Sequence, residues 1–450
     1  MNKGRRNFLR SSALFGTGVL ASKTAAAQHE QHQQTQPQAT KKEPSTKKEP
    51  STRQQAPLKV DKPSPPVGNV PVITPDIPKL EWTMENGVKV FHLSADVVKR
   101  EFLPASSMGP AKVVDVWGYN GSMPGPTIEV NEGDRVRIMF HNNLPEDTTI
   151  HWHGLEVPLE MDGTPYISQP MVKPGGVFLY EFTLNQNGTF FYHSHGAMQE
   201  MMGQIGFFII HPKKPHSPPV HKDFGLILQE WAVLPNNTVP NTMAMEFNWL
   251  TINGKAAPAT TPMIVKQGER VRIRLVNLGM DHHPIHVHGN QFYVTGTEGG
   301  RIPQSAWYPG NTVLVGVAQA RDIEFDAVYA GDWILHCHLP HHMMNQMISM
   351  VGPMSHGGHE LEPGAAPSRE DKKRVPGYPQ DDLMMTMFMD KEVAKPETMG
   401  LAPGWSAALQ GMMSLVRVLP PDKYEQVMTA IREKRVEQPK SPPAHKHHDD

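Results

Sequence analysis

Short runs of alternating apolar and polar residues, separated by Gly, Pro and Asn, occupy the middle of this chain. Clear examples lie at residues 127–130, 135–140 and 178–182. Alternation with a period of two is typical of strands that bury one face, and many short strands between turn residues favour a β-sandwich. We therefore predict an all-β fold that begins near Pro78. The 43 prolines fit a chain rich in loops.

The two ends of the chain have a different character. Residues 28–77 are rich in Gln, Lys, Pro, Ser and Thr, so we interpret them as a disordered tether that buries too little apolar surface to fold. Beyond the sandwich region, residues 354–450 read as a Met-rich, partly helical extension. Apolar residues at helical spacing predict helices over 405–418 and 422–435. The segment 384–389 is rich in methionine, which suits either a soft metal or the filling of a core.

Residues 1–27 have the layout of an export signal. Arg5 and Arg6 precede Phe8 and Leu9, a short apolar run follows, and small residues end the segment. This order resembles a twin-arginine signal, with a generic signal or a short anchor as the alternatives. No later segment reaches about 18 uninterrupted apolar residues, so we expect no membrane span. The sequence predicts a periplasmic or otherwise exported protein.

The region between these ends repeats itself. Gly133 precedes His151 by the same interval that separates Gly268 from His286, and both histidines open a His-x-His pair. Two further His-x-His pairs, which begin at His193 and His336, match at a slightly larger offset. Two homologous domains, at residues 78–212 and 223–353, are the simplest explanation, joined by a proline-rich linker at 212–223.

The repeated histidines predict a metal centre. On a strand, residues i and i+2 share a face, so each pair can present two imidazoles to one point. Imidazole suits copper, and burying so many ring nitrogens without a metal is costly. The pairs are His151 with His153, His193 with His195, His286 with His288, and His336 with His338.

Cys337 is the only cysteine, which excludes an intrachain disulfide. On a strand its side chain points away from those of His336 and His338. His342 follows Cys337 closely, and Met347 follows His342 at the same interval. A thiolate, an imidazole and a thioether are ligands of a blue-copper electron-transfer site, so three of four ligands are within one short stretch.

These motifs resemble those of the multicopper oxidases over residues 110–350. The matching text is His151-Trp-His-Gly, Tyr192-His-Ser-His, His283-Pro-Ile-His-Val-His-Gly and the stretch from His336 to Met347. The resemblance implies two cupredoxin-like Greek-key sandwiches that hold one type 1, one type 2 and two type 3 copper ions. It implies a type 1 set of His283, Cys337, His342 and axial Met347, and type 2 ligands His151 and His286. The implied type 3 ligands are His153, His193, His195, His288, His336 and His338.

Several neighbouring residues leave alternatives. His282 and His341 adjoin assigned ligands and compete with them on paper. Asp162, which follows His153, is either a turn residue before Gly163 or a carboxylate that supplies protons near the cluster. Shifting the type 1 ligands back by the repeat offsets gives Thr148, Ser194, Gln199 and Gln204. None of these is a type 1 ligand, so the first domain should hold no type 1 copper.

The stretch between His151 and His283 is too short to contain a middle domain. The chain therefore resembles the two-domain small laccases, whose three-copper cluster forms between subunits of a trimer, and the resemblance implies a homotrimer. The expected activity is one-electron oxidation of Cu(I), a phenol or an aromatic amine, coupled to reduction of O2 to water. The electrons are expected to enter the type 1 site through an exposed edge of His342 or His283. Copper tolerance is the favoured role. A copper carrier without turnover and a nitrite reductase-like enzyme are the alternatives, and a net charge of −2 gives no reason to expect nucleic acid as a partner.

Overall fold

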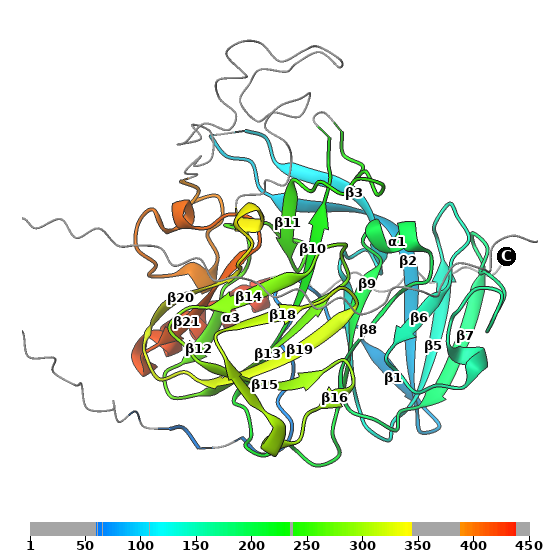
Figure 1. The fold of residues 1–450 in the computed structure, drawn as a ribbon, viewed down its shortest axis with the longest axis horizontal. Coiled ribbons are helices and arrows are strands. Elements are labelled where there is room, and N and C mark those ends of the chain that lie inside the picture. The colour runs from blue at the N-terminus through cyan, green and yellow to red at the C-terminus, as the bar shows by residue number, and fades with distance from the viewer. Residues whose placement is uncertain are drawn as a thin grey trace, which may run out of the picture. The chain divides into compact units, whose positions relative to one another are not determined.

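The alternating runs form the strands of two β-sandwiches in the computed structural model (Figure 1). The structure describes residues 60–343 and 388–437, apart from positions 61, 65, 108, 235 and 236. The expected export signal and most of the expected tether lie outside the described residues, as does Met347. No helix in the described ranges is both long and apolar enough to cross a membrane.

The first sandwich consists of two sheets. One has the strand order β4 (Gly125–Asn131), β9 (Ile205–His211), β8 (Gly188–Ser194) and β6 (Ile150–His153). The other has the order β1 (Trp82–Glu85), β2 (Val88–Leu103), β5 (Arg135–Asn142) and β7 (Val177–Thr183), with β3 (Lys112–Tyr119) paired to β2. Two short helical turns, η1 (Leu159–Met161) and α1 (Ala197–Met201), lie in its connections.

The second sandwich repeats this plan. One sheet has the order β12 (Met263–Lys266), β21 (Met413–Leu419), β20 (Gly331–Cys337), β14 (His283–Val287) and β18 (Thr312–Val315). The other has the order β11 (Trp249–Ile252), β10 (Lys222–Trp231), β13 (Arg270–Asn277), β19 (Gln319–Asp326), β15 (Phe292–Thr297) and β16 (Gly300–Arg301), with β17 (Tyr308–Gly310) on β15. The remaining elements are η2 (Gln304–Ala306), η3 (Pro340–Met343), η4 (Pro396–Thr398), η5 (Trp405–Ala408) and α3 (Pro421–Glu437).

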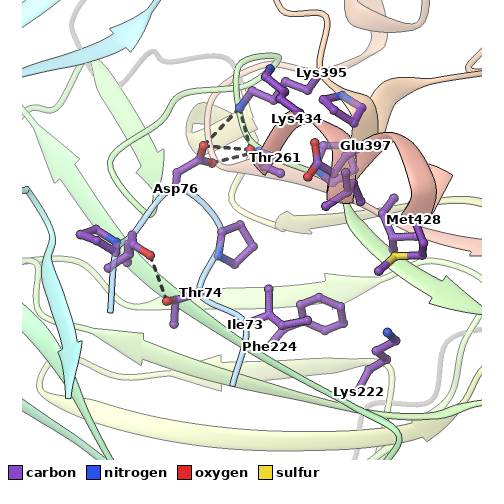
Figure 2. A pocket seen from close by; sticks show the side chains of 17 residues that line it. Ile73, Thr74, Asp76, Lys222, Phe224, Thr261, Lys395, Glu397, Met428 and Lys434 are labelled. Atoms are coloured by element: carbon purple, nitrogen blue, oxygen red, sulfur yellow. Dashed lines mark hydrogen bonds and ion pairs between the residues drawn. The ribbon is translucent and has the colours of Figure 1, made fainter. Parts of the chain in front are cut away.

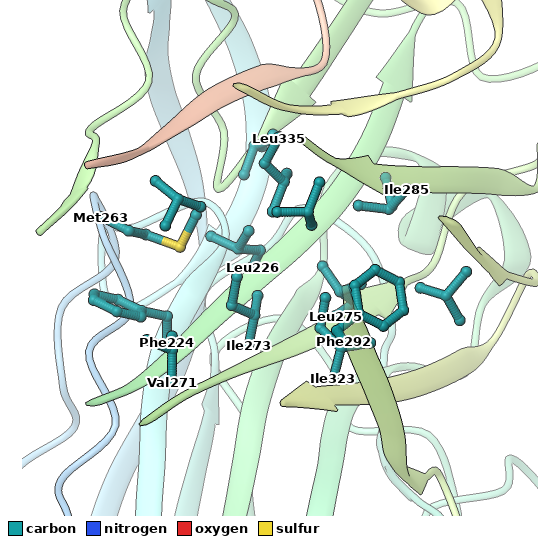
Figure 3. Packing of buried hydrophobic residues seen from close by; sticks show 14 of the residues in the cluster. Phe224, Leu226, Met263, Val271, Ile273, Leu275, Ile285, Phe292, Ile323 and Leu335 are labelled. Carbon is teal, nitrogen blue, oxygen red and sulfur yellow. The ribbon is translucent and has the colours of Figure 1, made fainter. Parts of the chain in front are cut away.

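Alternation along the strands creates the two cores. In β5, Val136, Ile138 and Phe140 are buried while most of their neighbours are partly or fully exposed, as the period of two requires. In the second sandwich, Leu226 and Ile273 of one sheet face Leu335 of the other across the core (Figure 3). Burying this apolar surface supplies the main favourable free energy of folding. The prediction of an all-β fold with two cupredoxin-like sandwiches is confirmed.

The predicted helix over residues 405–418 is wrong over its second half. Residues Met413–Leu419 form β21, which lies between β12 and β20 (Figure 1). Leu415, Val416 and Val418 are all buried there, because a strand inside a covered sheet is apolar on both faces. A short apolar run of this kind does not distinguish a strand from a helix. The second predicted helix is present as α3, so the segment after the expected domain end at 353 supplies an inner strand of the second sandwich.

The expected tether ends earlier than residue 77. Val72 is fully buried, its N–H donates to Glu129, and Ile73 forms a β-bridge with Phe224. Asp76 accepts a hydrogen bond from the Thr261 hydroxyl at the edge of a cavity of about 610 Å³ (Figure 2). The few apolar residues of the stretch 70–77, such as Val72, pack where the two sandwiches meet. The average composition of the tether did not predict this packing.

A buried ion cluster also joins the sandwiches. Asp223 is fully buried and accepts hydrogen bonds from Arg272 at 3.1 Å and from Arg274 at 2.9 Å. Arg274 also donates to Thr189 of β8, whose hydroxyl donates to Asp322 at 2.7 Å. Although burial raises the pKa of Asp223, the two guanidinium groups outweigh burial and hold that pKa well below its ordinary value. The buried carboxylate of β10 and the two buried guanidinium groups of β13 therefore stabilise one another in their charged forms.

We predict that Asp223→Asn lowers the free energy of unfolding by about 3–5 kcal/mol, because it leaves two buried arginines without their shared charge. Urea denaturation measures this loss. The matched control is Asp115→Asn, which removes an exposed pairing with Lys99 and should cost no more than about 1 kcal/mol. Equal losses from the two variants would contradict the expectation.

Candidate metal centres

The first candidate centre is the Cys337 cluster, which we define as His283, Cys337 and His342. Cys337 ends β20, His283 begins β14 and His342 lies in η3. The Cys337 Sγ atom lies 3.7 Å from His283 Nδ1 and 3.3 Å from His342 Nδ1, and the two nitrogens are 3.2 Å apart. All three residues are fully buried. Two nitrogens and one sulfur converging in this way suit a blue-copper ion.

The convergence distinguishes the ligand candidates from their neighbours. His282 and His341 are exposed, and the His282 ring accepts a hydrogen bond from the Val317 N–H at 3.1 Å. Neither ring belongs to the group whose donor atoms lie within 4.8 Å of one another. The structure brings together His283 and His342, as the sequence predicts.

Glu230 holds the His283 ring. Its buried carboxylate accepts from His283 Nε2 at 3.0 Å and from the N–H groups of Met280 and Asp281. Gly279 leaves the space for it, because a Cβ atom there would lie 2.1 Å from the carboxylate. With Nε2–H donating, Nδ1 keeps a lone pair for a metal. Sequence reasoning missed Glu230, and the only signal was an acid near the end of β10, after the apolar residues that follow Asp223.

Burial tunes the protonation of this cluster. Burial raises the pKa of the Cys337 thiol to about 12. Burial, together with the nearby His283 ring, lowers the pKa of His342 to about 4. Burial alone would raise the pKa of Glu230, but the hydrogen bond from His283 brings that pKa below its ordinary value. At neutral pH the imidazole of His342 is therefore free to bind a metal, whereas the thiol must lose its proton as the metal binds.

The expected exposed edge of His283 or His342 is not found in the described part of the chain, where both side chains are 0% exposed. Asp281 is the polar group that reaches from the surface toward this cluster. Its carboxylate is partly exposed and lies 3.5 Å from His342 Nε2. The His342 ring packs inside the sandwich because η3 folds back against the start of β21. There the His342 backbone oxygen accepts a hydrogen bond from the Met412 N–H.

The first tetrad comprises His151, His153, His193 and His195. His151 and His153 lie on β6 and His193 lies on the neighbouring β8, directly opposite His151, while His195 follows the end of β8. His153 Nδ1 lies 3.3 Å from His193 Nε2, and the rings of His151 and His195 are 5.4 Å apart. Burial and the charge of His193 lower the pKa of His153 to about 4. Neutral imidazoles converging from two adjacent strands can bind a metal ion such as copper.

Two carboxylates adjoin the first tetrad. His151 Nδ1 donates to the backbone oxygen of Asp162 at 2.8 Å and lies 3.5 Å from its carboxylate. The Glu200 carboxylate lies 3.4 Å from His193 Nδ1. The first contact places Asp162 next to His151, and its role with protons stays a prediction. The sequence did not predict the contact of Glu200, because α1 packs against β8 only once the chain has folded.

The second tetrad comprises His286, His288, His336 and His338. It repeats the first tetrad at the ends of β14 and β20: His286 is directly opposite His336, and His288 and His338 follow the last residues of the two strands. His286 Nδ1 donates to Asn311 O at 2.7 Å and His336 Nδ1 donates to Cys337 O at 2.9 Å. His288 Nε2 lies 3.1 Å from His336 Nε2, and the His286 and His338 rings are 5.6 Å apart. Both Nδ1–H groups are thus tied to the backbone, which leaves Nε2 for a metal.

The first sandwich has no cluster that matches the Cys337 cluster among its described residues. Ser194 lies between His193 and His195 and bonds Gln199 Oε1 at 2.6 Å. Thr148 donates to the same oxygen at 2.8 Å. Hydroxyl and amide groups thus fill the positions of the cysteine and histidines. The arrangement agrees with a single thiolate site.

The two tetrads do not contact each other in the part of the chain that the structure describes. Among the described residues no hydrogen bond or ring contact joins a histidine of one tetrad to a histidine of the other. His195, His288 and His338 are exposed. Each tetrad therefore presents open imidazoles at the surface.

Comparisons with known proteins agree with this geometry. Two family models, both described as multicopper oxidase, match residues 105–215 and 232–353, together just over half of the chain. The chain belongs to the multicopper oxidase family.

Individual relatives cover less. Copper resistance protein A of Pseudomonas syringae pv. tomato is 41% identical over 112 residues, which are 25% of this chain and 18% of the relative. Laccase-2 of Botryotinia fuckeliana is 31% identical over 240 residues, which are 48% of this chain and 41% of the relative. The chain thus spans less than half the length of these two curated relatives.

Two solved structures are also similar. The multicopper oxidase mgLAC has a TM-score of 0.52 and 30% identity, covering 57% of this chain and 81% of its own. The blue copper oxidase from Nitrosomonas europaea has a TM-score of 0.51 and 30% identity, covering 56% and 80%.

We predict that the Cys337 thiol of the copper-free folded protein resists alkylation at pH 8, because it is fully buried and its pKa is about 12. Mass spectrometry after iodoacetamide treatment measures this. The same protein in guanidinium chloride is the control and should be alkylated completely. Rapid alkylation of the folded protein would show that the cluster is open to solvent.

Proposed function

We propose that this chain is an exported multicopper oxidase that couples one-electron oxidation of a small donor to reduction of O2 to water. Copper bound at the Cys337 cluster and the tetrads supplies the one-electron and four-electron chemistry. His283, Cys337 and His342 would hold a type 1 ion. His151 and His286 would hold the type 2 ion, and the other six histidines of the tetrads would hold the type 3 pair.

One observation carries the proposal. Cys337 contributes its sulfur to one cluster, while its neighbours His336 and His338 belong to the second tetrad. Adjacent residues of a strand point to opposite faces, so a single strand serves both centres. An electron accepted at the thiolate therefore has a short covalent path to the imidazoles. A copper carrier has no need of such a connection.

The donor that we favour is Cu(I), which fits a role in copper tolerance. Met280 is exposed beside Asp281, and a thioether next to a carboxylate is a suitable place for a soft cation. The similarity to copper resistance protein A also supports this donor. A phenol or an aromatic amine is the alternative, supported by the similarity to a laccase. We further propose that the Asp162 carboxylate, which lies beside His151, helps to deliver the protons that O2 reduction consumes.

We predict that Cys337→Ser abolishes both the blue colour and oxygen uptake, because the thiolate ligand and the electron path are lost together. The measurement is oxygen consumption by copper-loaded protein, with Cu(I) and with a phenol. His92→Gln, on an exposed position of β2, is the control and should retain the wild-type rate. Oxygen uptake by Cys337→Ser with either donor would refute the proposal. Absence of uptake by the wild type would favour the carrier.

We also propose that the working enzyme is a homotrimer in which the first tetrad of one subunit meets the second tetrad of the next. The separation of the tetrads supports this, because neither alone offers a full set of ligands. Both sandwiches also carry exposed apolar residues. Those in the β6–β7 connection are Leu159, Tyr166 and Ile167, and Leu314 is exposed on β18, which pairs with β14. A head-to-tail contact of this kind closes into a ring.

Mixing two inactive variants tests the assembly. Protein assembled from equal amounts of His153→Ala and His288→Ala should regain about a quarter of the wild-type oxygen uptake, because one random interface in four has both tetrads intact. The control mixture, His153→Ala with His193→Ala, has no intact first tetrad and should stay inactive. No recovery in the first mixture would indicate that each chain builds its cluster alone.

A further inference from the structure

The register between β20 and β21 places a methionine beside Cys337. His336 is opposite Met413 on this antiparallel ladder, and Leu335 is opposite Ser414, so the next position sets Cys337 opposite Met412. The Cys337 N–H donates to Met412 O at 3.0 Å, and the Met412 N–H donates to His342 O at 2.9 Å. Met412 is thus bonded through its backbone to two members of the Cys337 cluster. Its side chain is fully buried.

The first sandwich identifies the residue that corresponds to Met412 in the repeat. His193 is opposite Ile205 on β8 and β9, which sets Ser194 opposite Gln204. The Ser194 N–H donates to Gln204 O at 3.3 Å, and the Gln204 N–H donates to Gln199 O at 3.4 Å. Ser194 and Gln199 match Cys337 and His342 in the repeat. The spatial counterpart of Gln204 in the second sandwich is therefore Met412.

Spacing along the sequence selects a different residue. Gln204 follows Ser194 at the same interval at which Met347 follows Cys337. The chain between cluster and strand is much longer in the second sandwich. In the first sandwich β9 begins at Ile205, soon after Ser194, whereas β21 begins only at Met413, far beyond Cys337. An insertion therefore separates the counterpart in space from the counterpart in sequence.

We propose that Met412 supplies the axial thioether of the type 1 copper, an inference that rests on the proposed type 1 site. Directly opposite residues on an antiparallel ladder project from the same face with Cβ atoms about 4.5–5.5 Å apart. The Cys337 Sγ atom points toward His283 and His342 on that face. A flexible thioether beside a site with two histidines and one cysteine is the weak axial ligand of blue-copper proteins.

Met263 provides a measure of ordinary core packing. It is fully buried in the same apolar cluster, but it is opposite Val416 on β12 and β21 and contacts no member of the Cys337 cluster through its backbone. A methionine that only fills space should behave like Met263 on substitution. A methionine that coordinates copper should alter the colour and potential of the site.

The test compares Met412→Leu, Met347→Leu and Met263→Leu in the copper-loaded full chain. Leucine conserves volume, so each variant should fold, with circular dichroism as the check. We expect Met412→Leu alone to shift the thiolate absorption band and the electron paramagnetic resonance signal and to raise the reduction potential. Met412→Gln retains an axial oxygen donor and should lower the potential. If Met412→Leu does not accumulate as folded protein, Met412→Gln is used for the test instead.

The outcomes separate this inference from the proposed function. A shift caused by Met347→Leu and not by Met412→Leu overturns the assignment, as do equal shifts from both or no shift from either. A shift of equal size from Met263→Leu reduces the effect to packing and also overturns it. If the copper-loaded wild type has no thiolate absorption, the type 1 site itself fails.

Discussion

The alternation of side chains along β20 is the constraint on which the rest of the structure depends. One face of the strand sends Cys337 into the sandwich, and the other places His336 opposite His286 of β14, among the rings of the second tetrad. An antiparallel neighbour on each side holds this register, with β14 on one edge and β21 on the other (Figure 1). A slip of one residue would exchange the faces and separate the sulfur from both imidazoles. The link between the two proposed copper centres is therefore a consequence of sheet geometry.

Buried polar groups keep the site ready for a metal. Glu230 would be costly to bury alone, but it accepts three hydrogen bonds and fixes the His283 ring. In the sheet register, Asn277 is opposite Leu228 and its repeat Asn142 is opposite Ala95, so Glu230 corresponds to Val97 in the first sandwich. That sandwich has a hydroxyl and amide network in place of a thiolate cluster. The carboxylate therefore accompanies the only half of the repeat that has the cysteine.

The second sandwich is completed by a strand that is distant in the sequence. β21 binds both β12 and β20, and its first residues follow the insertion that begins after η3. Folding of this half requires the chain to close a long loop, which costs entropy that grows only slowly with length. The buried apolar side chains of β21 offset that cost. The proposed electron-accepting site is thus stabilised by residues from both ends of one insertion.

The sequence alone determined the class of fold, the duplication and the positions of the histidines and the cysteine, because strand alternation and ligand spacing are local properties. It also favoured His283 and His342 over His282 and His341 as ligands, and the structure brings the favoured pair together with Cys337. It did not find Glu230, Glu200 or the strand at Met413–Leu419, since each acquires its partner only when distant segments pack. The burial of His283 and His342 was also decided by tertiary structure, because exposure depends on what packs over a residue rather than on its neighbours in the chain.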